Sequence, residues 1–167
     1  MLLACSMTIF ASCSSDDGGD SSNNTSEGSF FKIDEKEFDM SQSFPSATIL
    51  IGGLEDLSEP RTASLEFLGR NGDERAIVNF RITYMENEGI SGTYLPEENN
   101  SQVGVFDTYF SQYVIHNVND PNLEESSEVT SGTLTITDNG NKNYTIVYDV
   151  VYDDGKTSSA NFTQTFL

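Results

Sequence analysis

Cysteine and histidine are scarce in this sequence, and each shortage excludes a class of function. The 167 residues contain only Cys5 and Cys13, so everything after position 13 lacks thiols and disulfides and must be held together by packing alone. His116 is the only histidine, so one chain cannot form a histidine pair for a metal site or a proton relay. No Gly-x-Ser-x-Gly motif is present, which argues against a serine hydrolase.

Positive charge is also in short supply. Eight lysine and arginine residues stand against 27 aspartate and glutamate residues, giving a formal net charge of −19. Such a chain repels phosphate backbones and does not favour lying flat on an anionic membrane. We therefore expect no nucleic-acid partner, and the plainest consequence of the acidity is solubility.

Long apolar runs and helical periodicity are missing as well. The one apolar run, 2–11, has the length of a signal peptide and is too short to span a bilayer. No segment of ten or more residues repeats its apolar side chains at the helical spacing of 3.6 residues. Helices are therefore not expected, and strands remain as the elements from which a fold is built.

Short segments of alternating polarity, separated by turn residues, fill the chain from Phe30 onward. The clearest pair is 62–69 and 75–85, joined at Asn71-Gly72, which predicts a hairpin because such turns need a positive φ. The chain ends in a three-stranded meander. The acidic segment 119–128, in contrast, predicts a loop or one helical turn.

These patterns indicate an all-β fold. We predict an antiparallel meander of about 8–10 strands that forms a β-sandwich or a flattened, lipocalin-like barrel.

The residues around Cys13 indicate where the protein is located. In Phe10-Ala11-Ser12-Cys13, small residues end the apolar run before a cysteine, and an acidic stretch, 14–20, follows. This arrangement resembles the signal of bacterial lipoproteins, in particular the surface lipoproteins of the Bacteroidetes type. The resemblance implies that Cys13 is acylated after removal of residues 1–12. It also implies an outer-membrane or cell-surface location, with the membrane as a partner through the acyl chains.

The resemblance implies that the chain is divided into three parts. Residues 1–12 are the expected lipoprotein signal peptide, and 13–29 are the lipidated cysteine and a flexible acidic tether. The tether has no large apolar side chain and cannot offset the entropy cost of ordering. Residues 30–167 are the expected single all-β domain. Such signals usually begin with lysine or arginine, so we expect the natural reading frame to begin upstream of Met1.

Four aromatic residues are candidates for ligand binding. They are Tyr94, Tyr109, Phe110 and Tyr113. Aromatic rings exposed on a β surface can stack on sugar rings because they offer a flat apolar face. The same residues can equally fill a β core, as expected for a chain with 11 phenylalanines, 7 tyrosines and no tryptophan. The spacing along the chain does not separate these two interpretations.

Four acidic residues are the best candidates for metal ligands. They are Asp120, Glu124, Glu125 and Glu128, whose hard oxygen atoms would suit Ca²⁺. They do not match the spacing of an EF-hand loop, and solvated loop charges account for them as well. We expect no metal and no cofactor.

Function is predicted only coarsely. We expect a lipid-anchored envelope or cell-surface lipoprotein that is a binding or structural module and no enzyme. Capture of glycans or nutrients is the natural role for such a location, with a glycan or an outer-membrane protein as partner. A lipocalin-like carrier of a small apolar ligand is one alternative, and it predicts an enclosed pocket of a few hundred cubic ångströms. A carboxylate-based hydrolase is the other, and it predicts two facing carboxylates about 5–10 Å apart.

Overall fold

The computed structural model describes residues 29–42, 47–52, 60–98, 102–120 and 122–166, and this part of the chain is all-β as predicted. Its strands, in chain order, are β1 Phe30–Ile33, β2 Lys36–Asp39, β3 Ala47–Gly52, β4 Pro60–Asn71, β5 Glu74–Met85, β6 Gly92–Glu97, β7 Val105–Asp107, β8 Gln112–Asn117, β9 Glu124–Asp138, β10 Asn143–Tyr152 and β11 Thr157–Thr165. A single 3-10 turn, η1, covers Met40–Gln42. No helix within these ranges has the length and apolarity needed to cross a membrane.

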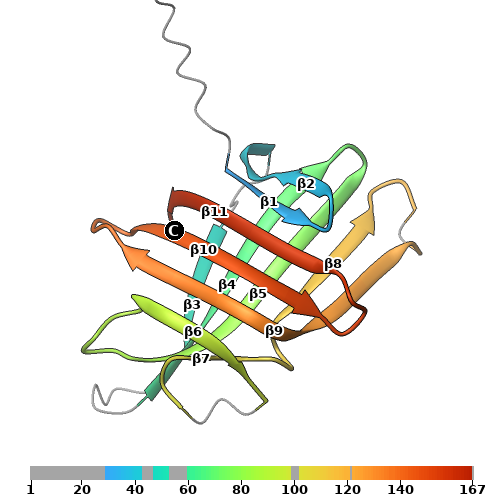
Figure 1. Ribbon diagram of the computed structural model, residues 1–167. Coiled ribbons are helices and arrows are strands. Elements are labelled where there is room, and N and C mark those ends of the chain that lie inside the picture. The colour runs from blue at the N-terminus through green and yellow to red at the C-terminus, as the bar shows by residue number, and fades with distance from the viewer. Residues whose placement is uncertain (1–28, 43–46, 53–59, 99–101, 121, 167) are drawn as a thin grey trace, which may run out of the picture.

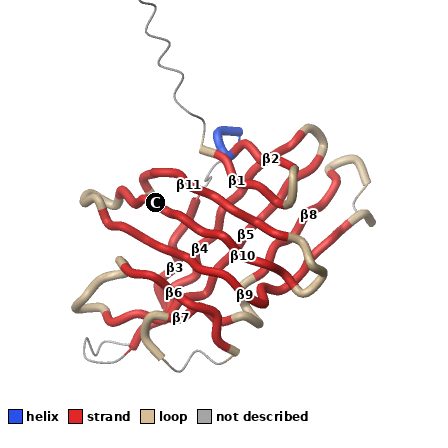
Figure 2. The backbone as a smooth tube through the Cα atoms, viewed as in Figure 1, coloured by secondary structure: helices blue, strands red, loops and turns tan. Residues whose placement is uncertain are grey.

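The strands join into one sheet that closes on itself as a flattened barrel. Their order is β3-β4-β2-β1-β11-β10-β9-β6-β7-β5-β8, and the additional β4–β5 pairing closes the ring. Figure 1 shows two layers, with β1, β11, β10 and β9 crossing in front of β3, β4, β5 and β8. Figure 2 shows that strand makes up most of both layers. The described pairings are antiparallel, as expected, except for the parallel pair β6–β7.

The long strands β5 and β9 are bridged differently at their two ends. β8 pairs with both of them at one end. At the other end β7 pairs with β5, and β6 pairs with β9. The stretch 106–118 therefore contributes to two strands of the eleven-stranded sheet, β7 and β8.

The β4–β5 hairpin forms as predicted, but its turn lies one residue later. Asn71 still pairs with Glu74, so the two turn residues are Gly72 and Asp73. Gly72 has a φ of 58°, the conformation for which glycine is favoured. The Asn71 side chain instead donates a hydrogen bond to the Glu37 carbonyl at 2.9 Å, which ties the hairpin to β2.

The prediction of a loop or helical turn over 119–128 was wrong for its second half, because β9 begins at Glu124. In this part of β9, Glu125 and Ser127 lie on the face that continues inward to Val129. Both residues are polar, so the hydrophobic alternation that identifies a strand is absent. The polar side chains that remove the strand pattern from this part of the sequence also line one mouth of the barrel.

A β-bulge separates the two halves of β9. Ser131 pairs with Val151 and Val129 pairs with Tyr152, which leaves Thr130 as an extra residue. Gly132, two residues later, has a φ of 120°, and a Cβ there would collide with the carbonyl oxygen of Asp149. The bend allows β9 to pair with β10 along one half and with β8 along the other.

Aromatic side chains fill the space between the two layers. The Phe67 ring of β4 lies 5.2–6.4 Å, between centroids, from four other rings. These are Phe80 of β5, Tyr148 of β10, Phe162 of β11 and Phe166 just after β11. The Phe67 side chain is fully buried. The rings pack mostly edge to face or tilted, the arrangements that their quadrupoles favour. The described interior is therefore a packed core.

Candidate functional site

The structure separates the four aromatic candidates into two pairs. Tyr94 and Tyr113 are 2% and 0% exposed, and the Tyr94 hydroxyl donates a hydrogen bond to the Ile90 carbonyl at 2.8 Å. Both are core residues, so the hypothesis that they belong to an exposed aromatic surface was wrong. Tyr109 and Phe110, in contrast, are 64% and 47% exposed. They follow directly on each other in the connection between β7 and β8.

Tyr109, Phe110 and the neighbouring Arg81 form a compact surface that we call the aromatic corner. The two rings meet edge to face with their centroids 4.9 Å apart. The Arg81 guanidinium carbon lies 4.5 Å from the centroid of the Phe110 ring, within the range of a cation–π contact. The flat faces of an aromatic ring and a guanidinium group are thus presented together at the surface.

Buried hydrogen bonds fix the backbone beneath the aromatic corner. The Asp107 carboxylate, which is buried, accepts a hydrogen bond from the Tyr109 backbone N–H at 3.0 Å. The hydroxyl of buried Ser111 accepts one from the Arg81 backbone N–H at 3.1 Å. The backbone of the corner is therefore held from both sides.

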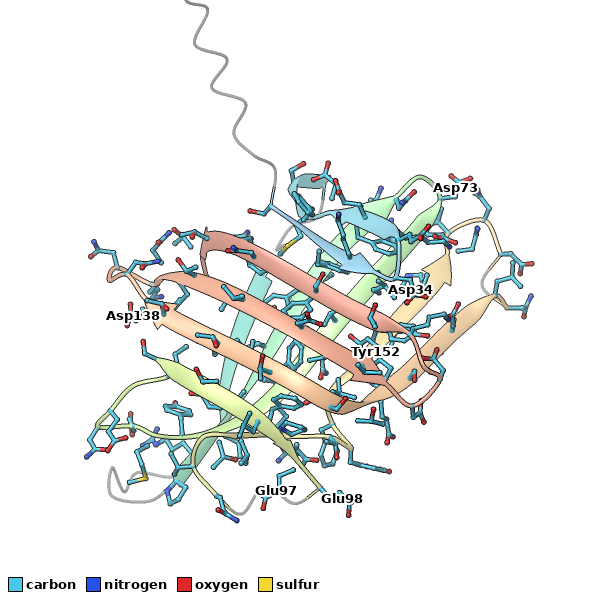
Figure 3. The ribbon with its side chains drawn as sticks, viewed as in Figure 1. Asp34, Asp73, Glu97, Glu98, Asp138 and Tyr152 are labelled. Atoms are coloured by element: carbon cyan, nitrogen blue, oxygen red, sulfur yellow. The ribbon has the colours of Figure 1, made fainter. Side chains whose placement is uncertain are left out.

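Polar groups lie next to the aromatic corner on β6. The Glu97 carbonyl accepts a hydrogen bond from Thr108 N–H at 3.0 Å, and the Glu97 carboxylate accepts one from Gln102 Nε2 at 3.0 Å. Figure 3 shows Glu97 and Glu98 together at the end of β6. In Figure 1 this end of the molecule lies opposite β1, where the described domain begins. The corner therefore combines exposed rings with carboxylate, amide and guanidinium groups, far from the start of the domain.

A second site lies at one mouth of the barrel. A hollow of about 750 Å³ is open to solvent there. It is lined by Ile33, Asp34, Glu35, Lys36, Ile115, Glu125, Lys156 and Thr157. At its edge the Tyr113 hydroxyl oxygen lies 2.7 Å from Glu125 Oε1 and 2.5 Å from Asp154 Oδ2. Lys156 Nζ donates a hydrogen bond to the same phenol oxygen at 3.1 Å.

The Lys156 ammonium offsets part of the negative charge at this mouth. Lys156 forms ion pairs with both Glu125 and Asp154, the latter at 3.3 Å. Burial raises the pKa of Tyr113, and the hydrogen bond to Asp154 raises it further, so the phenol remains a neutral donor. The two carboxylates are close, but they share one ammonium group and one phenol. This arrangement favours a structural network that ties the β10–β11 turn to β8 and β9.

The candidate calcium ligands do not converge on one point. Glu124 and Glu128 lie on the outward face of β9, opposite His116 and Gln112 of β8, whereas Glu125 lies on the inward face. Asp120 accepts two hydrogen bonds from Asn122 within its own loop, both at 3.1 Å. Within the described ranges, no three acidic, histidine or cysteine side chains are grouped closely enough to hold a metal ion.

Known proteins offer no guide to either site. The chain matches no protein-family model, no curated protein and no solved structure. Cys13, the expected signal peptide and the expected tether up to residue 28 lie outside the described residues. Arg81 cannot be identified as a site residue from the sequence, because its stacking on Phe110 depends on how β5 meets the end of the β7–β8 connection. No local motif indicates this contact.

Proposed function

We propose that this protein is a lipid-anchored binding module of the bacterial envelope or cell surface, and that it captures carbohydrate at the aromatic corner. The observation that supports the binding role is the exposure of Tyr109 and Phe110 beside Arg81 on a rigid backbone. Exposed aromatic rings next to polar groups are typical of ligand surfaces. Sugar rings match such a surface because their apolar faces stack on aromatic rings while their hydroxyl groups bind planar polar side chains.

The rest of the described domain supports a binding surface over the two alternatives. The interior between the layers is filled by aromatic residues around Phe67, which leaves a carrier of apolar ligands little internal space. The closest carboxylates at the barrel mouth, Glu125 and Asp154, are paired with Lys156 and Tyr113, which leaves a hydrolase without a free acid and base. The aromatic corner, by comparison, has two rings that remain 64% and 47% exposed.

The anchor is tested by replacing Cys13 with serine. More than one acyl chain is needed for stable membrane attachment, and all of them would be lost with the Cys13 sulfur and the processing that it directs. We expect wild-type protein to stay with the membrane fraction after a high-salt wash and Cys13→Ser protein to be released. Cys5→Ser is the matched control and should remain attached. An unmodified Cys13 thiol in mass spectra of membrane-extracted protein would end the proposal of a lipid anchor.

The binding role is tested by removing the two rings together. Tyr109→Ala/Phe110→Ala should weaken binding to any carbohydrate identified on a glycan array by about tenfold or more, because each lost stacking contact contributes about 0.5–1.5 kcal/mol beyond its area. Phe30→Ala, which removes an exposed ring from β1, should leave affinity unchanged. Both variants should unfold at the wild-type temperature. Failure of the wild-type protein to bind any glycan on the array would contradict this role.

A further inference from the structure

A continuous outward face runs from the aromatic corner along β5 and β8, and we call it the β5–β8 strip. Its residues lie in register: Arg75 with His116, Ile77 with Val114, and Asn79 with Gln112. Arg81 and the aromatic corner follow at one end. Arg75 and Arg81 are separated by six residue steps, or roughly 20 Å at the rise of an antiparallel strand. This length suits an extended ligand with several rings.

The end of the strip opposite the aromatic corner is basic. Arg75 lies between Arg70 of β4 and His116 of β8 in one row across the sheet. Like charges directly opposite each other destabilise an antiparallel pair, so Arg70 and Arg75 are a costly combination. Acidic residues occur only at the two ends of the row, where Asp39 is in register with Arg70 and Glu124 with His116.

The three arginines on this face form no ion pair with a carboxylate of the described residues. Among the described residues, Lys32, Lys36, Arg61 and Lys156 form ion pairs with carboxylates, but Arg70, Arg75 and Arg81 form none. Three of the chain's eight basic residues therefore lie on the outward side of β4 and β5 with no counter-ion in the described domain. A chain with 27 acidic residues has many ways to neutralise them. Guanidinium groups of this kind are well suited to binding a carboxylate from an external ligand.

The basic end is also hollowed. An open hollow of about 470 Å³ is lined by Arg75, His116, Asn117, Val118 and Glu124. Two backbone hydrogen bonds hold its rim, from Val118 N–H to the Asp73 carbonyl at 2.8 Å and from Asn117 N–H to the Leu123 carbonyl at 3.2 Å. The hollow thus offers guanidinium and imidazole donors in a concave, ordered setting, where a carboxylate can be bound by several groups at once.

We propose that the β5–β8 strip binds a linear anionic glycan, with a sugar ring stacked at the aromatic corner and a carboxylate bound at Arg70 and Arg75. This inference rests on the proposed function and adds the charge and the direction of the ligand. The amide row of Asn79 and Gln112 provides donors and acceptors for hydroxyl groups between the two ends. At physiological salt the Debye length is about 8 Å, so more distant carboxylates are largely screened while the arginines act at contact.

The middle of the strip argues for a glycan over a nucleic acid. Glu66 is in register with Asn79, and Glu128 with Gln112, so carboxylates flank the amide row on both sides. A nucleic-acid strand would bring a phosphate close to them at every nucleotide. A glycan that carries its acidic group at the Arg75 end and hydroxyl groups in the middle avoids that repulsion.

The test uses full-length protein and two probes: an oligomer of glucose that ends in a single glucuronic acid, and the same oligomer with that acid converted to its methyl ester. The acid should bind about tenfold more tightly than the ester, because hydrogen bonds to charged groups are stronger than neutral ones. Arg70→Gln/Arg75→Gln should lower the affinity for the acid to that for the ester and leave the ester unchanged. Lys32→Gln/Lys142→Gln removes the same charge away from the strip and should retain the preference.

Each other outcome is decisive. One such outcome is equal affinity for the acid and the ester, with binding of both probes lost in Tyr109→Ala/Phe110→Ala. It would contradict anion binding by the strip and support sugar binding at the aromatic corner. Loss of the preference for the acid in Lys32→Gln/Lys142→Gln would show that the preference is a general effect of net charge. That result would contradict binding of the carboxylate at Arg70 and Arg75. Absence of binding to both probes would contradict the proposal that the β5–β8 strip binds an anionic glycan. Carbohydrate binding at the aromatic corner would then be tested separately on the glycan array. Tighter binding of a single-stranded oligothymidylate than of the acid would also contradict the proposal for the strip.

Discussion

Replacing Phe67 by alanine is expected to lower the free energy of unfolding by about 3–5 kcal/mol. Phe67 is fully buried on β4, in the back layer, and its ring meets Tyr148 and Phe162 of the front layer at centroid distances of 6.0 and 5.2 Å. Truncation removes the contacts through which the two layers hold each other and leaves a cavity that the closed sheet cannot easily collapse. Urea unfolding followed by tyrosine fluorescence measures the loss.

Two controls separate this effect from a general loss of aromatic area. Phe67→Leu keeps most of the volume and should cost clearly less than alanine. Phe110→Ala removes the same side chain from an exposed position and should stay within about 0.5 kcal/mol of wild type. A loss below about 1 kcal/mol for Phe67→Ala would mean that the two layers do not share one core.

Strands with one apolar and one polar face could be predicted from the sequence. The hairpin of β4 and β5 and the meander of β10 and β11 alternate cleanly, because one face packs on the core and the other meets solvent. The first part of β9 does not alternate, since Glu125 points inward into the network with Tyr113 and Lys156. A polar inward face arises from tertiary pairing, and no local pattern indicates it.

Tertiary pairing also determines which of the aromatic candidates are exposed. In β8 the outward residue Val114 and the inward residue Ile115 are both apolar, so the sequence does not tell on which face Tyr113 lies. Tyr109 and Phe110 are exposed because the chain leaves β7 there and turns into β8. Arg70, Arg75 and Arg81 share one face only because β4 and β5 pair in register. Spacing along the chain reveals none of these neighbours.

Raising the pH above 10 is expected to unfold the domain through its buried tyrosines. Burial raises the pKa of Tyr148 well above its ordinary value of 10.0, and the neighbouring Tyr152 raises it further. Burial likewise raises the pKa of Tyr152, Tyr94 and Tyr113. In the unfolded chain these groups ionise near 10, whereas in the folded domain they keep their protons. Between the two pKa values the unfolded state binds fewer protons, so stability falls as the pH rises.

The size of this effect follows from the two most deeply buried groups. Tyr148 and Tyr152 together should lower the free energy of unfolding by about 3 kcal/mol per pH unit above 10, enough to exhaust a typical domain's stability within a few units. Circular dichroism and tyrosinate absorbance should change together across one pH series in a Tyr109→Phe variant, which lacks the most exposed tyrosine, because the buried rings ionise only as the barrel opens.

Tyr148→Phe is the informative variant for this prediction. Ser158 Oγ lies 3.3 Å from the Tyr148 hydroxyl and donates a hydrogen bond to the Lys32 carbonyl at 2.6 Å, so it keeps a partner when the phenol is removed. The variant should lose some stability at neutral pH, about 1 kcal/mol, but its stability should decline with pH by about 1.4 kcal/mol per unit less than that of wild type. If Tyr148 and Tyr152 ionise near pH 10 while the circular dichroism stays native, their rings are accessible to solvent, and the packed core inferred between the two layers is incorrect.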